Sequence, residues 1–246
     1  MKAAYPEIER LIAQLDLIAE LSREDRAALE LLPIRTRTVP ERRDVIREGS
    51  HPTDCCLVVD GMLCRYKMLS NGRRQMLSIH FSGDLPDLQS LNLGVMDHSL
   101  ATITQSRIAF IPHDSIRKLL KARPGVADAF MKHLLVDAAI YREWIANIGR
   151  RTALERIAHV ICECFTRLSA LGLAKPATFE LPMTQSELGD ATGLSNVHVN
   201  RTVKELRRLG LLETTGKVHA ILDWDQLREA AGFEPSYLHL RRNMSR

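Results

Sequence analysis

The chain has 246 residues, a length that fits one or two domains. Its hydrophobic fraction of 45% and charged fraction of 26% are those of an ordinary globular protein and exclude the disordered and fibrous classes. The formal net charge of +4 permits nucleic-acid binding without indicating it, and no apolar run of about 18 residues is present to suggest a membrane span.

The N-terminal region, residues 7–32, has the apolar spacing of two helices, and Ser22 with Asp25 is expected to cap the second. Acidic residues interrupt its apolar part, which argues against a signal peptide. We therefore expect the protein to be cytoplasmic.

Short strand-like runs follow Pro33 and are separated by glycine-containing turns. Asn71-Gly72 between two such runs is a strong hairpin signal. Several short strands with this punctuation are typical of a small antiparallel roll or barrel. The expected strands cover residues 39–48, 55–59, 62–69, 75–81 and, as a pair, 101–111.

Five cysteines are present, an odd number without a Cys-x-x-Cys pair, which indicates neither a disulfide framework nor a metal site. Cys162 and Cys164 are two residues apart on a predicted helix and therefore point in different directions. Cys55, Cys56 and Cys64 lie in strand-like sequence. We interpret all five as buried apolar thiols, and a redox role of the three in the strands is the alternative.

A helix over about 114–122 and a longer helix over 125–149 follow the strands. Apolar residues repeat along the longer helix with alternating spacings of four and three, the pattern of helices that pair. A second apolar side, with Phe130, Leu135 and Trp144, would pack within the chain, so we predict a homodimer. The expected dimer interface comprises Ala127, Met131, Leu134, Ala138, Tyr141, Ile145 and Ile148.

Gly149 is expected to end the long helix, and Thr152 with Glu155 to cap the next one, over 153–171. The predicted fold class is therefore α+β. We expect a β-roll over 1–124, a dimerisation helix over 125–149 and a C-terminal domain over 150–246.

The segment Thr184 to Leu212 predicts two short helices joined by a tight turn. Thr184 is a good N-cap, and Glu187 three residues later completes a capping box. Gly193 allows the left-handed backbone that ends a helix, and Ser195 can cap the next one. This order is the helix-turn-helix pattern, whose second helix enters the major groove of DNA.

The second helix separates its residues into two faces. Val199, Val203 and Leu206 have the spacing of a core-facing stripe, so the polar residues lie outside. Arginine can bond bidentately to guanine, and asparagine to adenine. The outer face carries Asn196, Val197, Asn200 and Arg201 as candidate base contacts, and His198 and Lys204 as candidate phosphate contacts.

A β-hairpin is predicted immediately after this helix. Residues 210–214 and 218–222 read as two strands, and Gly216 lies in the turn between them. Lys217 at the tip would contact phosphate, which adds affinity without sequence preference. A short helix over 224–231 is expected after the hairpin.

Over nearly its whole length, this order of elements resembles the Crp/Fnr family of bacterial transcription regulators. The resemblance is carried by Gly149–Ile157 (GRRTALERI) and by Thr184–Leu212, and it is weaker over the roll. Asp223-Trp224 and Phe233–Leu240 (FEPSYLHL) are similar to one subgroup that is common in α-proteobacteria.

The resemblance implies a set of contact residues. The family's base readers would correspond to Asn196, Val197 and Arg201, and its phosphate contacts to Thr184, Ser195 and His198. Arg201 keeps the family arginine. Asn196 and Val197 replace the Arg and Glu of the cyclic-AMP-responsive member, so a different half-site sequence is implied.

The resemblance also implies a cyclic-nucleotide pocket, in which a Gly-Glu pair and an Arg-Ser pair hold the phosphate. The counterparts here are Gly83-Asp84 and His98-Ser99, a degenerate pocket that lacks the arginine. Neutral histidine is a poor replacement for a bidentate guanidinium. The sequence therefore argues against cyclic AMP and leaves the effector unassigned.

Other sensor chemistries of the family find weaker support. Residues 1–54 contain no cysteine, which argues against the N-terminal iron–sulfur cluster of its oxygen-sensing members. His80 and His113 could serve as haem ligands, although a single histidine is more often structural. No catalytic motif was found, and no enzyme activity, cofactor or metal is predicted.

We therefore expect a sequence-specific regulator that binds double-stranded DNA as a homodimer on a palindromic operator and contacts RNA polymerase if it is an activator. The alternative is a small-molecule, haem or thiol-redox sensor whose DNA binding is secondary or independent of an effector.

Overall fold

The computed structural model describes residues 6–241. Contacts divide the chain into two compact units. The first contains the described parts of 1–67, 79–138 and 240–246, and the second contains 68–78 and 139–239. The division falls within the long helix, and each unit is described by itself.

The first unit begins with α1 (Pro6–Asp16) and α2 (Arg23–Glu30). The amide of Asp25 donates to Ser22 Oγ at 3.1 Å and the amide of Ser22 donates to Asp25 Oδ2 at 3.3 Å, so the predicted capping box is confirmed. α1 buries its apolar stripe, as its spacing of apolar residues predicts.

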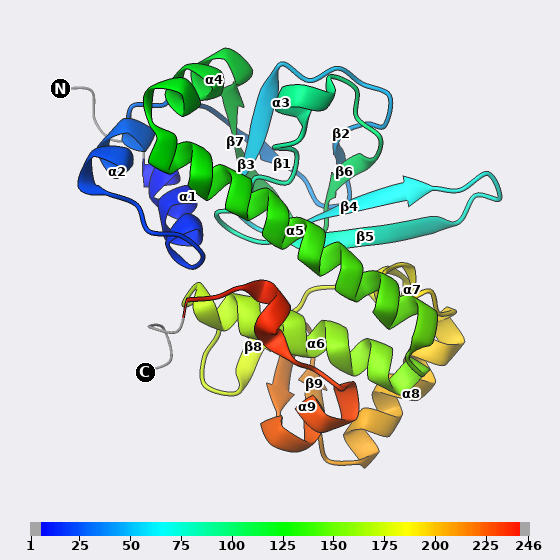
Figure 1. Cartoon of the computed structure of the whole chain (residues 1–246). Helices are drawn as coiled ribbons and strands as arrows, with labels where there is room; N and C mark the ends of the chain where they lie inside the picture. Colours follow the sequence, from blue (N-terminus) through cyan, green and yellow to red (C-terminus); the bar gives the residue numbers. More distant parts are fainter. Residues whose placement is uncertain (1–5, 242–246) are drawn as a thin grey trace. The chain divides into compact units, whose positions relative to one another are not determined.

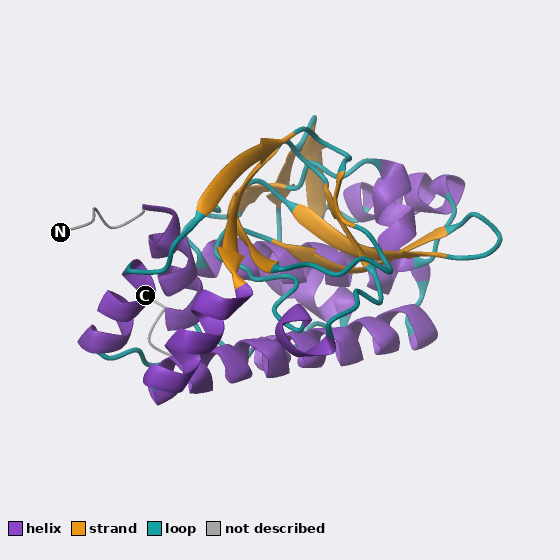
Figure 2. Cartoon of the chain, turned by 90° about the horizontal axis from the view of Figure 1, so that it is seen from above, coloured by secondary structure: helices purple, strands orange, loops and turns teal. Residues whose placement is uncertain are grey.

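Two antiparallel sheets build the roll, which confirms the predicted fold class (Figures 1 and 2). One sheet has the strand order β1-β7-β3 and the other has the order β2-β6-β4-β5. The strands are β1 (Arg35–Val39), β2 (Asp44–Ile46), β3 (Asp54–Asp60), β4 (Leu63–Met68), β5 (Arg74–His80), β6 (Ser99–Thr102) and β7 (Ser106–Pro112). Two helices, α3 (Ser90–Leu93) and α4 (His113–Ala122), complete this part.

The sequence did not predict β1 and α3. β1 is an edge strand that pairs with β7 alone, and its first four residues are all exposed, so no apolar alternation marks it. α3 has four residues, too few for a helical period to be visible.

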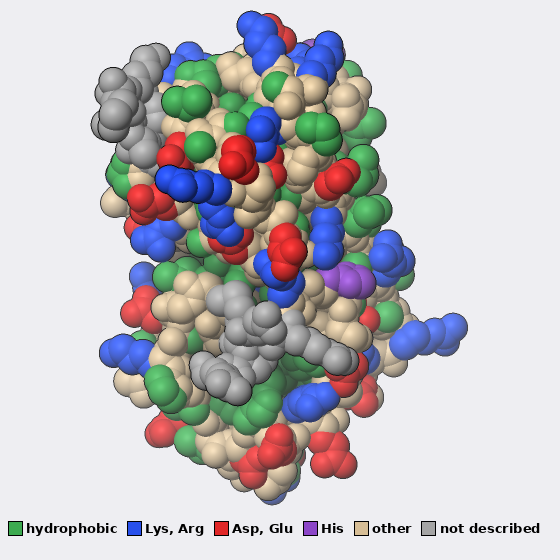
Figure 3. Space-filling view, turned by 60° about the vertical axis from the view of Figure 1, so that its left-hand side comes forward, with side chains coloured by type: hydrophobic (Ala, Val, Ile, Leu, Met, Phe, Trp, Pro, Cys, Tyr) green, Lys and Arg blue, Asp and Glu red, His purple; other side chains and the backbone are tan. Residues whose placement is uncertain are grey.

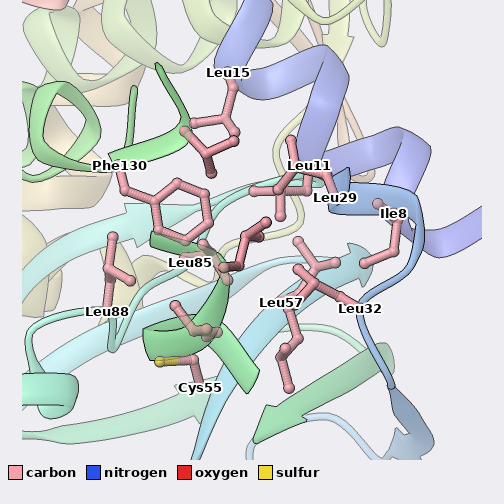
Figure 4. Close-up of a cluster of buried hydrophobic side chains, with 14 of the residues drawn as sticks. Ile8, Leu11, Leu15, Leu29, Leu32, Cys55, Leu57, Leu85, Leu88 and Phe130 are labelled. Atoms are coloured by element: carbon pink, nitrogen blue, oxygen red, sulfur yellow. The ribbon is translucent and has the colours of Figure 1, made fainter. Parts of the chain in front are cut away.

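An apolar core lies between the N-terminal helices, the sheet that contains β3, and the start of the long helix (Figure 4). Leu11, Leu57, Leu85 and Phe130 meet there, and Cys55 belongs to the same cluster. A second cluster includes Cys56, Val58 and Leu63 and fills the roll between its sheets. Burial of these side chains is the main stabilising contribution to the unit.

All five cysteines are free and buried, which confirms their interpretation as buried apolar thiols. Burial raises the pKa of Cys55 and Cys56 well above the ordinary value and that of Cys162 to about 12. These thiols are therefore protonated at neutral pH, whereas the thiolate is the form that reacts. A thiol-redox sensor therefore finds no support in their surroundings.

A buried ion pair crosses the interior of the first unit. Arg65, on β4, is 1% exposed and donates from its guanidinium NH2 group to Asp137 Oδ2 at 2.8 Å. Its Nε also donates to the carbonyl oxygen of Pro86. Burial alone would raise the pKa of Asp137, but the charge of Arg65, followed by those of His133 and His80, holds it below the ordinary value.

The long helix, α5 (Pro124–Arg150), confirms the helix predicted over 125–149. Its inner side buries Val126, Phe130, Ile140 and Trp144. The opposite side stays open in the single chain, including Leu135, which is 59% exposed although it was expected to pack within the chain. α5 thus has one apolar side that packs inward and another that is exposed at Met131, Leu135 and Ile145.

The second unit is built around α6 (Ala153–Ala170), which packs against α8 and α9 and is buried almost all round from Ile157 to Cys164. A three-stranded sheet in the order β8-β10-β9 completes this unit. After α6, this unit contains β8 (Thr178–Glu180), α7 (Gln185–Thr192), α8 (Asn196–Arg208), β9 (Leu212–Thr215), β10 (Val218–Ile221), α9 (Trp224–Ala231) and the 3-10 turn η1 (Pro235–Leu238). Over residues 6–241, no helix combines the length and apolarity that a membrane crossing requires.

A buried carboxylate joins three segments of the second unit. Glu163 on α6 accepts a hydrogen bond from Tyr237 Oη at 2.7 Å and from Trp144 Nε1 at 3.1 Å. Arg167 lies 3.6 Å from the same carboxylate. His159 stacks on Tyr237, and burial lowers its pKa to about 3, so it is neutral. The network fixes η1 and the end of α5 against α6.

Candidate nucleic-acid interface

The first helix of the predicted pair, α7, begins with the expected cap. The amide of Glu187 donates to Thr184 Oγ1 at 3.1 Å, and the amide of Thr184 donates to Glu187 Oε2 at 2.7 Å. The Thr184 hydroxyl also donates to Glu187 Oε2 at 2.8 Å. The hydroxyl of this candidate phosphate contact is therefore engaged within the cap.

Two glycines shape the turn between α7 and α8. Gly193 has a φ of +69° and ends α7 in the left-handed conformation, as predicted. A Cβ atom on Gly189 would lie 2.6 Å from the carbonyl oxygen of Leu194, which is closer than real Cβ atoms approach. The close approach of the turn to α7 therefore requires glycine at position 189, which the sequence reasoning did not identify.

α8 starts after Ser195, whose Oγ accepts from the amide of His198 at 3.4 Å and lies 3.1 Å from His198 Nδ1. Both are candidate phosphate contacts, and both are exposed. The buried face of α8 consists of Val199, Thr202 and Leu206. Val203 is only half-buried, because the helical period of 3.6 residues places Thr202 closer to the centre of the buried face.

The opposite face of α8 carries the predicted base readers. Asn196, Val197 and Arg201 are exposed and Asn200 is half-buried. The three polar side chains make no hydrogen bond or ion pair with any residue of the described range, and the same is true of Lys204. Their donors and acceptors are thus available to a ligand.

The late arginines of α8 differ from Arg201. Arg208 forms a bidentate pair with Glu205, at 2.7 and 2.9 Å, and Arg207 donates to the carbonyl oxygen of Thr214 at 3.5 Å. Both are thus tied to the protein itself. The available polar groups are therefore concentrated toward the N-terminal half of α8, the part that contacts base edges in helix-turn-helix proteins.

The predicted hairpin is present as β9 and β10, with Val218 opposite Thr215 and the turn at Gly216 and Lys217. Lys217 is exposed at this tip. On the face of the molecule seen in Figure 3, basic and acidic side chains are interspersed, so charge alone does not mark an interface there. α8 and its hairpin are recognised by geometry and by available donors.

The polar residues of the degenerate pocket are hydrogen-bonded within the protein. Gly83 has a φ of +93°, and a Cβ atom there would lie within 2.6 Å of atoms of α1. Asp84 is buried and accepts from Gln14 Nε2 and from the amide of Phe81, both at 2.9 Å. Ser99 Oγ accepts from the amide of Glu48 at 3.0 Å.

His98, at the place of the missing arginine, is buried and lies 2.7 Å from Asp97 Oδ1. Burial, followed by the charge of Arg65, lowers its pKa, so at neutral pH it carries no positive charge for a phosphate. Asp87, 0% exposed in the same segment, adds a carboxyl whose pKa burial raises to about 7. His98 therefore does not supply the charge of the missing arginine.

The two candidate haem ligands are also engaged. His80 Nδ1 lies 3.4 Å from Asp84 Oδ2, and burial lowers the pKa of His80 to about 4. His113 Nε2 lies 3.0 Å from Ser90 Oγ. The described residues contain no cluster of three or more metal-ligating side chains.

Sequence reasoning missed the Arg65–Asp137 pair, although a signal existed for each partner. Arg65 is in phase with the buried Leu63 along β4, and alternation places both on the inner face. Asp137 follows Phe130 by seven residues and shares its side of α5. Neither signal indicates that Arg65 and Asp137 would pair with each other.

Two family models match the chain. One describes a Crp-like helix-turn-helix domain and matches residues 155–230. The other describes a cyclic nucleotide-binding domain and matches residues 36–123. The first match contains α7, α8 and the hairpin, and the second contains the strands of the roll.

Curated relatives and solved structures agree with these matches. The transcriptional activator protein FnrL of Cereibacter sphaeroides is 28% identical over 221 residues, which cover 87% of each chain. The fumarate and nitrate reduction regulatory protein of Escherichia coli K12 is 22% identical over 221 residues, covering 90% of this chain and 88% of that one. FixK2 from Bradyrhizobium japonicum has the same fold, with a TM-score of 0.75 and 23% identity over 82% of this chain and all of that chain. From its roll, long helix and helix-turn-helix, and from these likenesses, the chain belongs to the Crp/Fnr family of transcription regulators.

Proposed function

We propose that this chain regulates transcription as a homodimer that binds a palindromic operator through α8, in the cytoplasm and under control of the roll. One observation carries this proposal: the exposed face of α8 presents Asn196, Asn200 and Arg201 without any partner among the described residues. Polar side chains of these types, at the start of the second helix of such a pair, fit base edges in the major groove.

The proposed contacts divide into two groups. Arg201 suits a bidentate bond to guanine and the two asparagines suit adenine, so these residues with Val197 would specify sequence. Phosphate contacts from Thr184, Ser195, His198, Lys204 and Lys217 would fix the register. Because the Thr184 hydroxyl is used within its cap, its contact would require a change of partner.

The exposed side of α5 supports the homodimer. None of the seven residues of the predicted interface is buried in the single chain, and Met131 and Ile145 are 57% and 71% exposed. An apolar stripe of this length is rarely left in water by a soluble protein. Pairing of two such stripes would cover it and would place two copies of α8 on one DNA duplex.

The dimer can be tested by placing a charge in the stripe. We expect Ile145→Glu to raise the dimer dissociation constant at least about 100-fold, because an unpaired carboxylate would be buried in the interface. Sedimentation velocity at micromolar protein should then show monomer where the wild type shows dimer. Ala146→Glu introduces the same side chain at the neighbouring exposed position outside the stripe and should stay dimeric. Equal behaviour of the two variants would refute this interface.

The residues at the pocket positions of the roll do not favour cyclic AMP as the signal. The position of the phosphate-binding arginine holds neutral His98, and buried carboxyls lie in the same segment. We propose that the roll acts through another signal, which changes the position of the DNA-binding unit because it binds one of two conformations more tightly. If the regulator is an activator, RNA polymerase is its further partner.

Selection of bound fragments from a random pool of double-stranded DNA tests this function. We expect a palindrome whose half-sites lie about one helical turn apart, roughly 34 Å centre to centre. The half-site gives the bases that α8 reads, and the spacing reports the dimer. Absence of any enriched sequence would contradict sequence-specific binding, and enrichment of an isolated half-site would contradict the dimer.

A further inference from the structure

Val197 stands out among the exposed side chains of α8. It is 77% exposed, the highest value among the large apolar side chains of residues 6–241. Its neighbours on the helix surface, Asn200 and Arg201, follow it by three and four residues and are polar. An apolar side chain in the middle of a polar face serves no packing role within the chain, so it fits a contact outside it.

The position of Val197 defines what it could reach. α8 begins at Asn196, directly after the Ser195 cap, so Val197 lies in the first turn. In helix-turn-helix proteins, N-terminal residues of the second helix approach base edges in the major groove. Valine is stiff about its first side-chain torsion in a helix, so its two methyl groups are held in place before binding and little entropy is lost.

Only one base offers an apolar group in the major groove, since thymine carries a 5-methyl group and the other three bases present polar edges. A valine placed against an amino group or a carbonyl would remove water from that group without replacing its hydrogen bond. The contact would therefore favour thymine by attraction and would disfavour other bases by unpaired polar groups.

We propose that Val197 reads the 5-methyl group of one thymine in each half-site. This inference rests on the proposed function, because it assumes that α8 enters the major groove. It assigns to Val197 a specificity-determining role and requires one thymine at a fixed position of the half-site, beside the bases that Asn200 and Arg201 contact.

Deoxyuridine differs from thymidine by the 5-methyl group alone and therefore isolates this contact. In the operator obtained by selection, each thymine of one half-site would be replaced in turn by deoxyuridine, and Kd measured by fluorescence anisotropy. We expect one position at which wild type loses about fourfold in affinity, the fold-change that corresponds to one buried methyl group. At that position Val197→Ala should bind thymine and deoxyuridine nearly equally.

Two further variants sharpen the test. Val95→Ala removes the same atoms from a 47% exposed valine of the roll and should keep the wild-type response to deoxyuridine. Val197→Glu should change the preferred base at the same position from thymine to cytosine, because a carboxylate accepts from the cytosine amino group.

The outcomes distinguish failure of the proposed function from failure of the Val197 contact. If no operator can be selected, the proposed function fails. If an operator is selected but no thymine position shows the loss, or if Val197→Ala responds to deoxyuridine as the wild type does, the function stands and the role of Val197 is refuted. A selected half-site without a fixed thymine also refutes it.

Discussion

Replacement of Arg201 by alanine should cost about 1–3 kcal/mol of operator affinity in each half-site, and about 2–6 kcal/mol for a dimer that uses both. The arginine is exposed and makes no hydrogen bond or ion pair within residues 6–241, so its removal leaves the fold of α8 intact. The loss should be specific to sequence, because a bidentate contact to guanine is the bond that distinguishes bases. Titrations at fixed salt, on the selected operator and on random DNA, would measure both affinities.

Lys204→Ala is the matched control for this variant. Lys204 is an exposed cation on the same helix, proposed to contact phosphate. Its removal should weaken binding to all sequences similarly and reduce the salt dependence by about one phosphate contact. If Arg201→Ala bound the operator like wild type, or lost affinity equally on every sequence, Arg201 would not be a base reader.

The second large effect is expected in the roll. Asp137→Asn should lower the free energy of unfolding by about 3–5 kcal/mol, because it removes the carboxylate that is paired with the buried guanidinium of Arg65. The two side chains are 2% and 11% exposed and 2.8 Å apart, so water cannot replace the lost partner. Urea denaturation followed by far-ultraviolet circular dichroism would measure the change.

Two further variants make this test specific. Asp128→Asn changes an exposed carboxylate on the same helix and should cost less than about 0.5 kcal/mol. Arg65→Met combined with Asp137→Leu removes both charges and should recover much of the loss, since paired apolar residues often replace a buried ion pair. If Asp137→Asn were as stable as Asp128→Asn, the Arg65–Asp137 pair would make no contribution to the free energy of unfolding.

The pH dependence follows from the same pair. The pKa of Asp137 lies below its ordinary value in the folded chain, so its stabilising effect is present above the ordinary pKa near 4 and is lost as the pH falls through the lower folded value. The wild type should therefore lose stability on acidification below about pH 4 more steeply than Asp137→Asn.

Local signals made the helix-turn-helix predictable. The box of Thr184 and Glu187, the left-handed Gly193 and the Ser195 cap each lie within a few residues of the elements they shape. The boxes that open α2 and α6 were predicted for the same reason. Such motifs depend on sequence neighbours only, and therefore need no knowledge of the fold.

Long-range contacts were not predictable in the same way. Arg65 and Asp137 are 72 residues apart, and Tyr237 donates to Glu163 across 74 residues. No local pattern pairs a buried charge with its partner, because the pairing depends on how β4 and α5 pack. The candidate base readers could be chosen from the helical period alone. Only the structure shows that the Thr184 hydroxyl is bonded within its cap.

The hydrogen bond from Trp144 to Glu163 also has a spectroscopic consequence. The chain contains two tryptophans, Trp144 and Trp224, and both belong to the second unit. Trp144 is 3% exposed and its indole nitrogen faces a carboxylate. Tryptophan fluorescence, excited selectively, therefore reports on the second unit and not on the first. Unfolding that is followed by both emission and circular dichroism would show whether the two units melt together or one after the other.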